Sequence, residues 1–270
     1  VSYVDVTISA VTPEGQAKAG GIVCLTNPTA DKQVVISNCR NYGTITADLD
    51  GVGGMGGIVG YGNANTLIEN CFNYGAVGTI EYRYAGGIVG YATGTSAEVK
   101  SCVNTAEVKG RIDVGGIVGI ATDIWTISDC TNSGAVTGAD TAAAGGIVGS
   151  IHGSTVSGCK NTAAVYGQYA GGVIGIAGAG EITNCSGGTA SITSPAFTLS
   201  FTGQTFTLAV EANQTAGRII GAHSGGGPDS WTKIAIDDEN GDGYDDIGTV
   251  GICGNFTTWA NLEIVSGTFY

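Results

Sequence analysis

Short apolar runs separated by polar turn residues recur along most of the chain. One stretch holds three of them, Gly116 to Ile120, Thr126 to Cys130 and Ala135 to Thr137. Short runs of this kind, bounded by Gly, Asn, Ser and Thr, are typical of β-strands. No window has the apolar spacing of an amphipathic helix. The pattern therefore predicts an all-β protein.

The first run of each stretch contains a pentapeptide, Gly-Gly-Ile-Val-Gly, that returns at a regular interval. Copies or close variants begin at residues 20, 56, 86, 115, 145 and 171, so successive copies are 36, 30, 29, 30 and 26 residues apart. A degenerate copy, Gly217 to Gly221, follows later. Self-similarity at a period of about 30 residues is the sequence signature of a repeat architecture.

A cysteine and an asparagine recur with the same period. The cysteines are Cys39, Cys71, Cys102, Cys130, Cys159 and Cys185. An asparagine stands two residues after each of the first five, at Asn41, Asn73, Asn104, Asn132 and Asn161. Asparagine suits turns, and stacked asparagine side chains can hydrogen-bond along a rod, so we assign this series a structural role.

The cysteine series has two interpretations, disulfides or free thiols. Stacked cysteines with parallel side chains are poorly oriented for a disulfide torsion, although their Cα atoms would be close enough. We favour an inward column of free thiols that pack as small apolar side chains. Cys24 and Cys253 lie outside the column, and either state remains open for them.

The repeat predicts a parallel β-solenoid of about six to seven coils, each of about 30 residues, because three short strands and three turns fill one such coil. Ile58, Ile88, Ile117 and Ile147 are then expected to stack as one inward apolar column. The paired glycines are expected to turn a corner of the coil where a Cβ atom would clash. A β-propeller is the alternative architecture, although its units are usually longer.

Three segments follow from the extent of the repeat. Residues 1–19 lack it and are expected to form a strand that caps the first coil, since an open solenoid end exposes unpaired backbone. Residues 20–193 form the solenoid. Residues 194–270 are expected to form a β-rich C-terminal cap, in which Phe197 to Phe201 and Thr205 to Val210 resemble a hairpin.

The amino-acid composition argues against some classes of function. The chain has 270 residues, 48 of them glycine, and a net charge of -13 with only 10 basic residues. Such a chain is unsuited to nucleic acid, whose phosphates require Lys and Arg. No apolar run is long enough for a transmembrane helix. No leader precedes Val1, so we expect the sequence to begin after a removed signal or at a chosen boundary.

A candidate metal site lies in the segment Asp238 to Asp246. Oxygen ligands at alternate positions, a glycine and a backbone carbonyl suit calcium. The segment resembles the calcium loop in β-hairpins of integrin-type propeller repeats. That resemblance implies a structural calcium ion held by Asp238, Asn240, Asp242, Asp246 and the carbonyl group of Tyr244. The alternative is an acidic hairpin tip without metal.

A second set of candidates lies between the valine segment and the next glycine pair, where the repeat varies most. Variable loops on one edge of a solenoid commonly form its binding face. Four tyrosines there are candidate ligand-binding residues, and simple loop variation is the alternative: Tyr82, Tyr84, Tyr166 and Tyr169. We find no nucleophile elbow or metalloprotease motif, and the acidic residues do not recur at one register, so no catalytic residue is predicted.

The repeats resemble those of bacterial surface proteins with the GLUG motif, which joins a Gly-Gly-Ile-Val-Gly unit to a Cys-x-Asn turn and a Gly-x-Val segment. The best copies are Ala85 to Tyr91 with Cys71 to Gly75, and Val114 to Ile120 with Cys130 to Gly134. The resemblance spans roughly residues 19–190 and 216–222. It implies a secreted or cell-wall location and an adhesin-like role, with any peptidase chemistry in a separate domain.

We therefore expect a non-catalytic, extracellular protein of a bacterial cell surface that acts in adhesion or as a display or spacer module. Its partner would be a host or bacterial surface glycan or protein, and the chain is expected to be monomeric. The alternative is a β-helix protein that binds or degrades polysaccharide, because parallel β-helices often carry lyases and hydrolases. A purely structural stalk is a third hypothesis.

Overall fold

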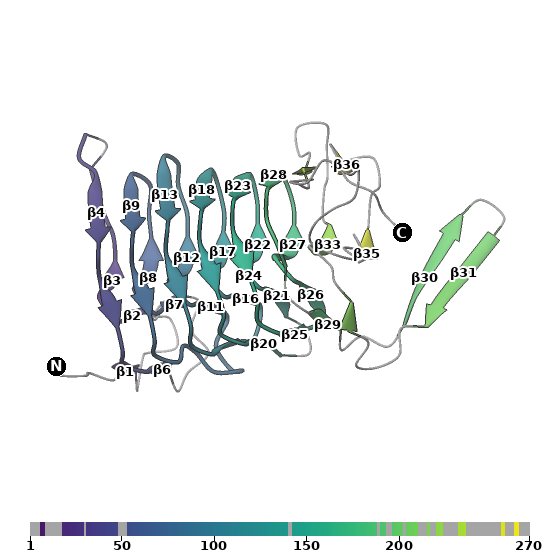
Figure 1. Cartoon of the computed structure of the whole chain (residues 1–270), viewed down its shortest axis with the longest axis horizontal. Helices are drawn as coiled ribbons and strands as arrows, with labels where there is room; N and C mark the ends of the chain where they lie inside the picture. The colour runs from purple at the N-terminus through teal and green to yellow at the C-terminus, as the bar shows by residue number, and fades with distance from the viewer. Residues whose placement is uncertain are drawn as a thin grey trace.

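A computed structural model shows an all-β protein whose coils stack side by side from the N-terminal end (Figure 1). The structure describes residues 6–8, 18–29, 31–47, 53–139 and 142–187. Beyond these it describes the strands at 190–192, 196–201, 204–209, 215–216, 220–223, 232–235, 255–256 and 262–264. The described residues contain no helix, and therefore none that could cross a membrane. The predicted parallel β-solenoid is confirmed.

One coil consists of five short strands rather than the three that the apolar runs suggested. In the third coil these are β11 (Tyr84–Gly86), β12 (Val89–Ala92), β13 (Ala97–Lys100), β14 (Val103–Asn104) and β15 (Val108–Gly110). The glycine pair divides the first run into two strands, and the residues around Cys102 divide the second. Each strand pairs in parallel with the same strand of the neighbouring coils.

Stacking builds five parallel sheets, which we name A to E. Sheet B contains β2 (Ala19–Gly20), β7 (Gly54–Gly56), β11, β16 (Asp113–Gly115), β21 (Ala143–Gly145) and β26 (Tyr169–Gly171). Sheet C contains β3 (Val23–Leu25), β8 (Val59–Gly62), β12, β17 (Val118–Ala121), β22 (Val148–Ile151), β27 (Ile174–Ala177), β33 (Ile220–His223) and β35 (Asn255–Phe256). Sheet D contains β4 (Val34–Ser37), β9 (Thr66–Glu69), β13, β18 (Trp125–Ser128), β23 (Ser154–Ser157), β28 (Gly180–Thr183), β34 (Thr232–Ala235) and β36 (Leu262–Ile264).

The two remaining sheets are shorter. Sheet E contains β5 (Arg40–Asn41), β10 (Phe72–Asn73), β14, β19 (Thr131–Asn132) and β24 (Lys160–Asn161). Sheet A contains β15, β20 (Val136–Gly138), β25 (Val165–Gly167), β29 (Ala190–Ile192) and the antiparallel β32 (Thr215–Ala216). The structure also contains two further pairs of strands. Near the N-terminus, β1 (Val6–Ile8) pairs in parallel with β6 (Ile45–Ala47). Towards the C-terminus, β30 (Ala196–Phe201) and β31 (Gln204–Ala209) form an antiparallel hairpin.

The described strands complete about five turns, fewer than the six to seven expected. The sixth copy of the repeat has Gly187 where the other copies have the asparagine of sheet E, and the last strand of that sheet is β24. The degenerate pentapeptide nevertheless supplies β33, which continues sheet C in parallel with β27. The boundaries predicted for the two caps stay predictions.

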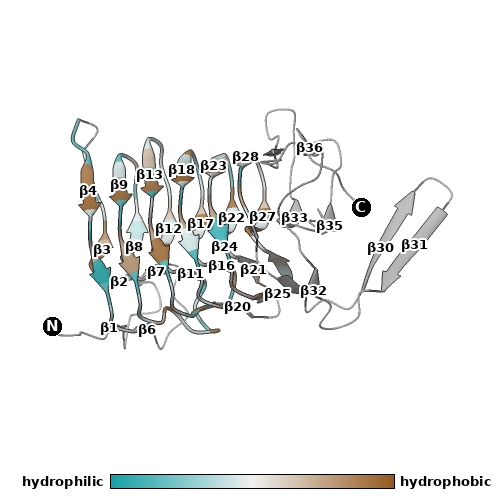
Figure 2. Ribbon diagram, viewed as in Figure 1, coloured by the Kyte–Doolittle hydropathy of each residue, from teal (hydrophilic) through white to brown (hydrophobic). Residues whose placement is uncertain are grey.

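In-register stacking places identical positions directly above one another, which confirms the inward columns. Ile58, Ile88, Ile117 and Ile147 are all fully buried, and Val173 continues their column. Burying one such side chain contributes about 1.5 to 3 kcal/mol. Apolar residues accordingly concentrate on the strands, whereas the turns between them are more polar (Figure 2). The core therefore grows by the same increment with each coil.

The coil encloses two hydrophobic cores, a division that the sequence did not predict. The larger core lies between sheets C and D and includes the cysteine column. The smaller core contains residues of sheets A and B, among them Met55 and Val108, together with Tyr82 from the loop before β11. Backbone approaches backbone between sheets B and C, where a Cβ atom on Gly90 would lie 2.3 Å from the Met55 nitrogen. Glycine is required at this contact because any side chain would separate the two sheets.

The cysteines and asparagines occupy the places expected of them. The described cysteines are all free, and Cys71, Cys102, Cys130, Cys159 and Cys185 are buried. Hydrogen bonding to neighbouring thiols and burial raise the pKa values of Cys130 and Cys185, so these thiols stay protonated. The asparagine side chains form a ladder in which each Nδ2 donates to the Oδ1 of the next coil at 2.7 to 2.9 Å.

Candidate functional site

The predicted calcium ligands lie outside the described residues. They are Asp238, Asn240, Asp242, Tyr244 and Asp246. Calcium binding at this segment stays a prediction. Within the part of the chain that the structure describes, no three His, Cys, Asp or Glu side chains gather closely enough to hold a metal ion.

Tyr82 is not a surface residue, which corrects its assignment to an exposed binding loop. Its side chain is fully buried in the smaller core, next to residues of sheets A and B. The loop that carries it turns inward, and backbone hydrogen bonds join Tyr82 to Thr79 and Arg111. A ring this size contributes more by filling the gap between the two sheets than by meeting solvent. Tyr82 therefore cannot contact a ligand directly.

The other three predicted tyrosines do not gather into one patch. Tyr84 and Tyr169 share one register position of sheet B, but β16 and β21 lie between them. Tyr166 lies on β25 of sheet A and is 43% exposed. The structure therefore distributes these side chains along and around the solenoid. Sequence variation in a loop did not reveal which way its side chains point.

Stacked tyrosines occur instead outside the variable loops, at Tyr61 and Tyr91. Tyr61 and Tyr91 stack with ring centroids 4.8 Å apart and an angle of 2° between the rings. The Lys18 ammonium lies 4.7 Å from the Tyr61 centroid, and Tyr84 and Tyr91 form a T-shaped contact with centroids 5.2 Å apart. The sequence contains a signal for this stack, because each of the two tyrosines directly follows a pentapeptide and therefore occupies the same position of the repeat. These ring faces pack on one another, so they are not a platform on which a sugar ring could stack.

A second stack lies on the outer face of sheet E. Tyr42 and Tyr74 have ring centroids 4.9 Å apart, and both rings are more than two-fifths exposed. Each follows one of the ladder asparagines, so in-register stacking again brings two identical side chains face to face. Arg40 lies over the neighbouring Phe72 ring, 5.2 Å from its centroid. These contacts stabilise the surface of the first two coils.

Asp113 is a buried carboxyl group at the junction of sheets B and C. It lies on β16 with 7% of its surface exposed and accepts a hydrogen bond from the Ser150 hydroxyl on β22. Burial raises the pKa of Asp113 to about 6, while the Ser150 hydrogen bond acts in the opposite direction. Burial also raises the pKa of Tyr84, the neighbour of Asp113 in the sheet, and the Asp113 charge adds to this effect. Ionised Asp113 is therefore a source of instability within the solenoid.

Replacing Asp113 with asparagine is expected to stabilise the protein in a pH-dependent way. The folded-state pKa of about 6 exceeds the ordinary 3.8. The folded chain therefore binds this proton more tightly, and wild-type stability falls as the pH rises from 4 through 6. The Asp113→Asn variant lacks this loss, so its advantage should grow from near zero at pH 4 to about 3 kcal/mol above pH 7. Urea unfolding at several pH values measures the difference.

Asp123→Asn is the matched control, because its expected effect has the opposite sign. The Gly94 amide and the Thr93 hydroxyl both donate to the Asp123 carboxylate at 2.8 Å and lower its pKa. Ionised Asp123 is therefore favoured in the folded state, and its neutral variant should be the less stable one at neutral pH. An advantage of Asp113→Asn that does not change with pH would contradict the assignment of a buried charge.

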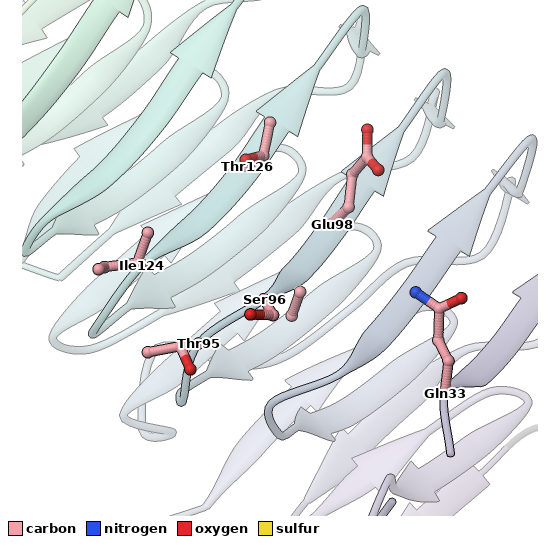
Figure 3. Close-up of a pocket in the computed structure, with 7 residues that line it drawn as sticks. Gln33, Thr95, Ser96, Glu98, Ile124 and Thr126 are labelled. Carbon is pink, nitrogen blue, oxygen red and sulfur yellow. The ribbon is translucent and has the colours of Figure 1, made fainter. Parts of the chain in front are cut away.

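A pocket of about 360 Å³ opens on the outer face of sheet D (Figure 3). Its lining comes from three coils: Gln33, Thr95, Ser96, Ala97, Glu98, Ile124 and Thr126. The sheet order β4, β9, β13, β18 places these residues along the solenoid axis. Figure 3 shows the labelled side chains on one side of the sheet, with Gln33 separated from Ser96 and Glu98 by an intervening strand.

Unequal turns between sheets C and D account for the pocket. The turn from β12 to β13 contains the four residues 93–96, whereas the turn from β8 to β9 contains only 63–65. Ser96 adopts a left-handed conformation with φ of 60°, and Gly94 has φ of 80°. The shorter turn of the second coil thus lies between the longer turn of the third coil and the segment before β4 of the first coil. The number of residues from the pentapeptide to the cysteine, 16 from Gly86 to Cys102 but 15 from Gly56 to Cys71 and from Gly115 to Cys130, could reveal the extra residue, but not the hollow that it creates.

Comparisons with known proteins confirm the GLUG motif over part of the chain. Residues 81–109 match the family model described as the GLUG motif. A search of curated proteins finds no match. Among solved structures, the chain is similar to a putative immunoglobulin A1 protease from Bacteroides ovatus, with 20% sequence identity and a TM-score of 0.39. That similarity covers 84% of this chain and 69% of the other chain.

Proposed function

We propose that this GLUG-motif β-solenoid repeat protein is a non-catalytic adhesion and display module of a bacterial cell surface. Its repeated residues have structural roles: glycines form the close contacts, isoleucines and cysteines fill the core, and asparagines form the ladder. Because these residues hold the fold together, the outward-facing residues can differ from coil to coil without loss of the fold. Each coil adds about 5 Å to the length of the solenoid.

The contrast between the two sides of sheet D carries the proposal. Inward positions keep one character, with Ile68, Val99, Ile127 and Val156 all buried. The outward positions of the same strands change from coil to coil: Leu67, Glu98, Thr126 and Thr155. Residues that face solvent and do not repeat are the ones on which a specific partner can depend. A binding surface along the rod, rather than one catalytic cluster, fits this distribution.

Binding and turnover measurements test the proposal. The purified chain, labelled on its amino groups, is applied to bacterial cells, host epithelial cells and immobilised surface polysaccharides, in calcium and in chelator. We expect saturable binding without release of shorter products. The proposed calcium ion at Asp238 to Asp246 should make binding or melting temperature sensitive to chelator. Shortening of any polysaccharide would favour the alternative, a degrading β-helix enzyme, and absence of all binding would leave only a structural stalk.

A further inference from the structure

We propose that the pocket on sheet D binds a short, neutral oligosaccharide that lies along the solenoid axis. This inference rests on the proposed binding function and names the ligand class and the place of contact. The pocket residues run from Gln33 on the first coil to Thr126 on the fourth. Three strand spacings correspond to about 14 Å. An elongated ligand that crosses the strands can therefore contact several coils at once.

The polar groups of the pocket are available to a ligand. Gln33, Thr95, Ser96 and Thr126 are exposed, and Glu98 is half-buried. Within the described part of the chain, no hydrogen bond or ion pair engages these five side chains, whereas the side chains of Thr93, Asn63 and Asp123 in nearby turns are all hydrogen-bonded. The pocket thus presents an amide, three hydroxyls and a carboxylate, which can both donate to and accept from the hydroxyls of a sugar.

The apolar part of the pocket is aliphatic. Ile124 is 62% exposed, although its side chain is large enough to favour burial. The C–H face of a pyranose ring can cover such a side chain and remove it from water. Val35, which shares the outward column of Glu98 and Thr126, is also more than half exposed. Polar groups around a small apolar surface are the usual composition of a small-ligand site.

Charge favours a neutral ligand over an ionic one. The pocket contains one carboxylate and no basic residue, and the whole chain carries a net charge of -13, so an anionic polymer is repelled. A cationic peptide is the competing ligand, since Glu98 could pair with Lys or Arg. However, Lys100 lies two residues further along the same strand and faces the same side, where it opposes a second positive charge.

Variants along one outward column test the proposal. Glu98 and Thr126 line the pocket, whereas Thr155 and Glu181 occupy the same column on later coils outside it. The full chain is titrated by NMR and calorimetry with neutral glucose, galactose, mannose and N-acetylglucosamine oligosaccharides, with a sulfated oligosaccharide and with an oligolysine peptide. We expect a neutral oligosaccharide to bind, and Glu98→Gln and Thr126→Val each to weaken it about tenfold. Glu181→Gln and Thr155→Val should leave its affinity unchanged.

Three results would overturn the proposal: no neutral oligosaccharide binds, the control variants weaken binding as much as the pocket variants, or oligolysine binds instead with an affinity that falls steeply with salt. Unchanged melting temperatures show that all four outward substitutions preserve the fold. Adhesion is scored separately. If the wild type binds cell surfaces but one of these three results is obtained, the pocket assignment fails while the proposed function stands, and if the wild type binds no surface, the proposed function itself fails.

Discussion

Replacing Gly87 with alanine is expected to prevent the third and fourth coils from stacking. A Cβ atom on Gly87 would lie 2.1 Å from the Gly116 carbonyl oxygen and 2.4 Å from the Asn104 Cγ atom. One of these neighbours is backbone, and the other belongs to the asparagine ladder, so neither can yield without breaking hydrogen bonds. We expect a loss of more than about 4 kcal/mol in the free energy of unfolding. Chemical unfolding followed by circular dichroism measures it.

Gly153→Ala is the matched control for this substitution. Its Cβ atom would come no closer than 3.9 Å to another residue, so only the backbone conformation, with φ of 91°, opposes it. A left-handed non-glycine residue costs about 1 to 2 kcal/mol. The Gly87 variant should therefore be much less stable than the Gly153 variant. Equal losses would show that backbone conformation, and not close stacking of coils, is what requires glycine.

Replacing Asn104 with alanine is expected to interrupt the asparagine ladder at its centre. The Asn104 Nδ2 donates to the Asn132 Oδ1 at 2.8 Å and to the Ala106 carbonyl oxygen at 2.8 Å. Its Oδ1 accepts from the Asn73 Nδ2 and the Ala106 amide. Alanine removes all four bonds in a buried site, although the Asn132 Oδ1 keeps its bond from the Gly134 amide and the Asn73 Nδ2 keeps its bond to the Gly75 carbonyl oxygen. Since an unsatisfied buried group costs about 1 to 3 kcal/mol, and relaxation recovers part of the loss, we expect a loss of about 3 to 5 kcal/mol.

The same substitution at the end of the ladder provides the control. Asn161 accepts from the Asn132 Nδ2 and bonds the backbone of Ala163, but Gly187 of the next coil has no side chain to continue the ladder. Asn161→Ala therefore removes fewer bonds and should cost less than Asn104→Ala in urea unfolding. If the two variants are equally unstable, the bonds within each turn dominate, and the ladder between coils contributes little.

Much of the fold could be predicted because each repeated residue packs against the equivalent residues of the adjacent coils. In a parallel solenoid, Ile88 lies between Ile58 and Ile117, and Asn104 lies between Asn73 and Asn132. The neighbours of such a residue in the adjacent coils are therefore known from its own identity. Tyr61 and Tyr91 also occupy one position of the repeat, after the pentapeptide, and the same in-register stacking brings their rings face to face.

The candidate site was less predictable, because it depends on contacts between different positions of the coil. Tyr82 is buried because the coil is narrowed between sheets B and C and closes a second core around the ring. The pocket near Glu98 exists because neighbouring turns differ in length. Neither the burial of Tyr82 nor the pocket can be read from one position of the repeat alone.

By itself, therefore, the sequence determined the period, the parallel stacking, the inward columns and the free thiols, since these depend on identical residues one strand spacing apart. The tertiary structure decided how the coil bends in cross-section. That bend divides the core in two, buries Tyr82 and Asp113, covers the faces of Tyr61 and Tyr91, and opens the pocket between Gln33 and Thr126. The physical reason is that packing between unlike positions depends on turn lengths and side-chain volumes that no periodic pattern records.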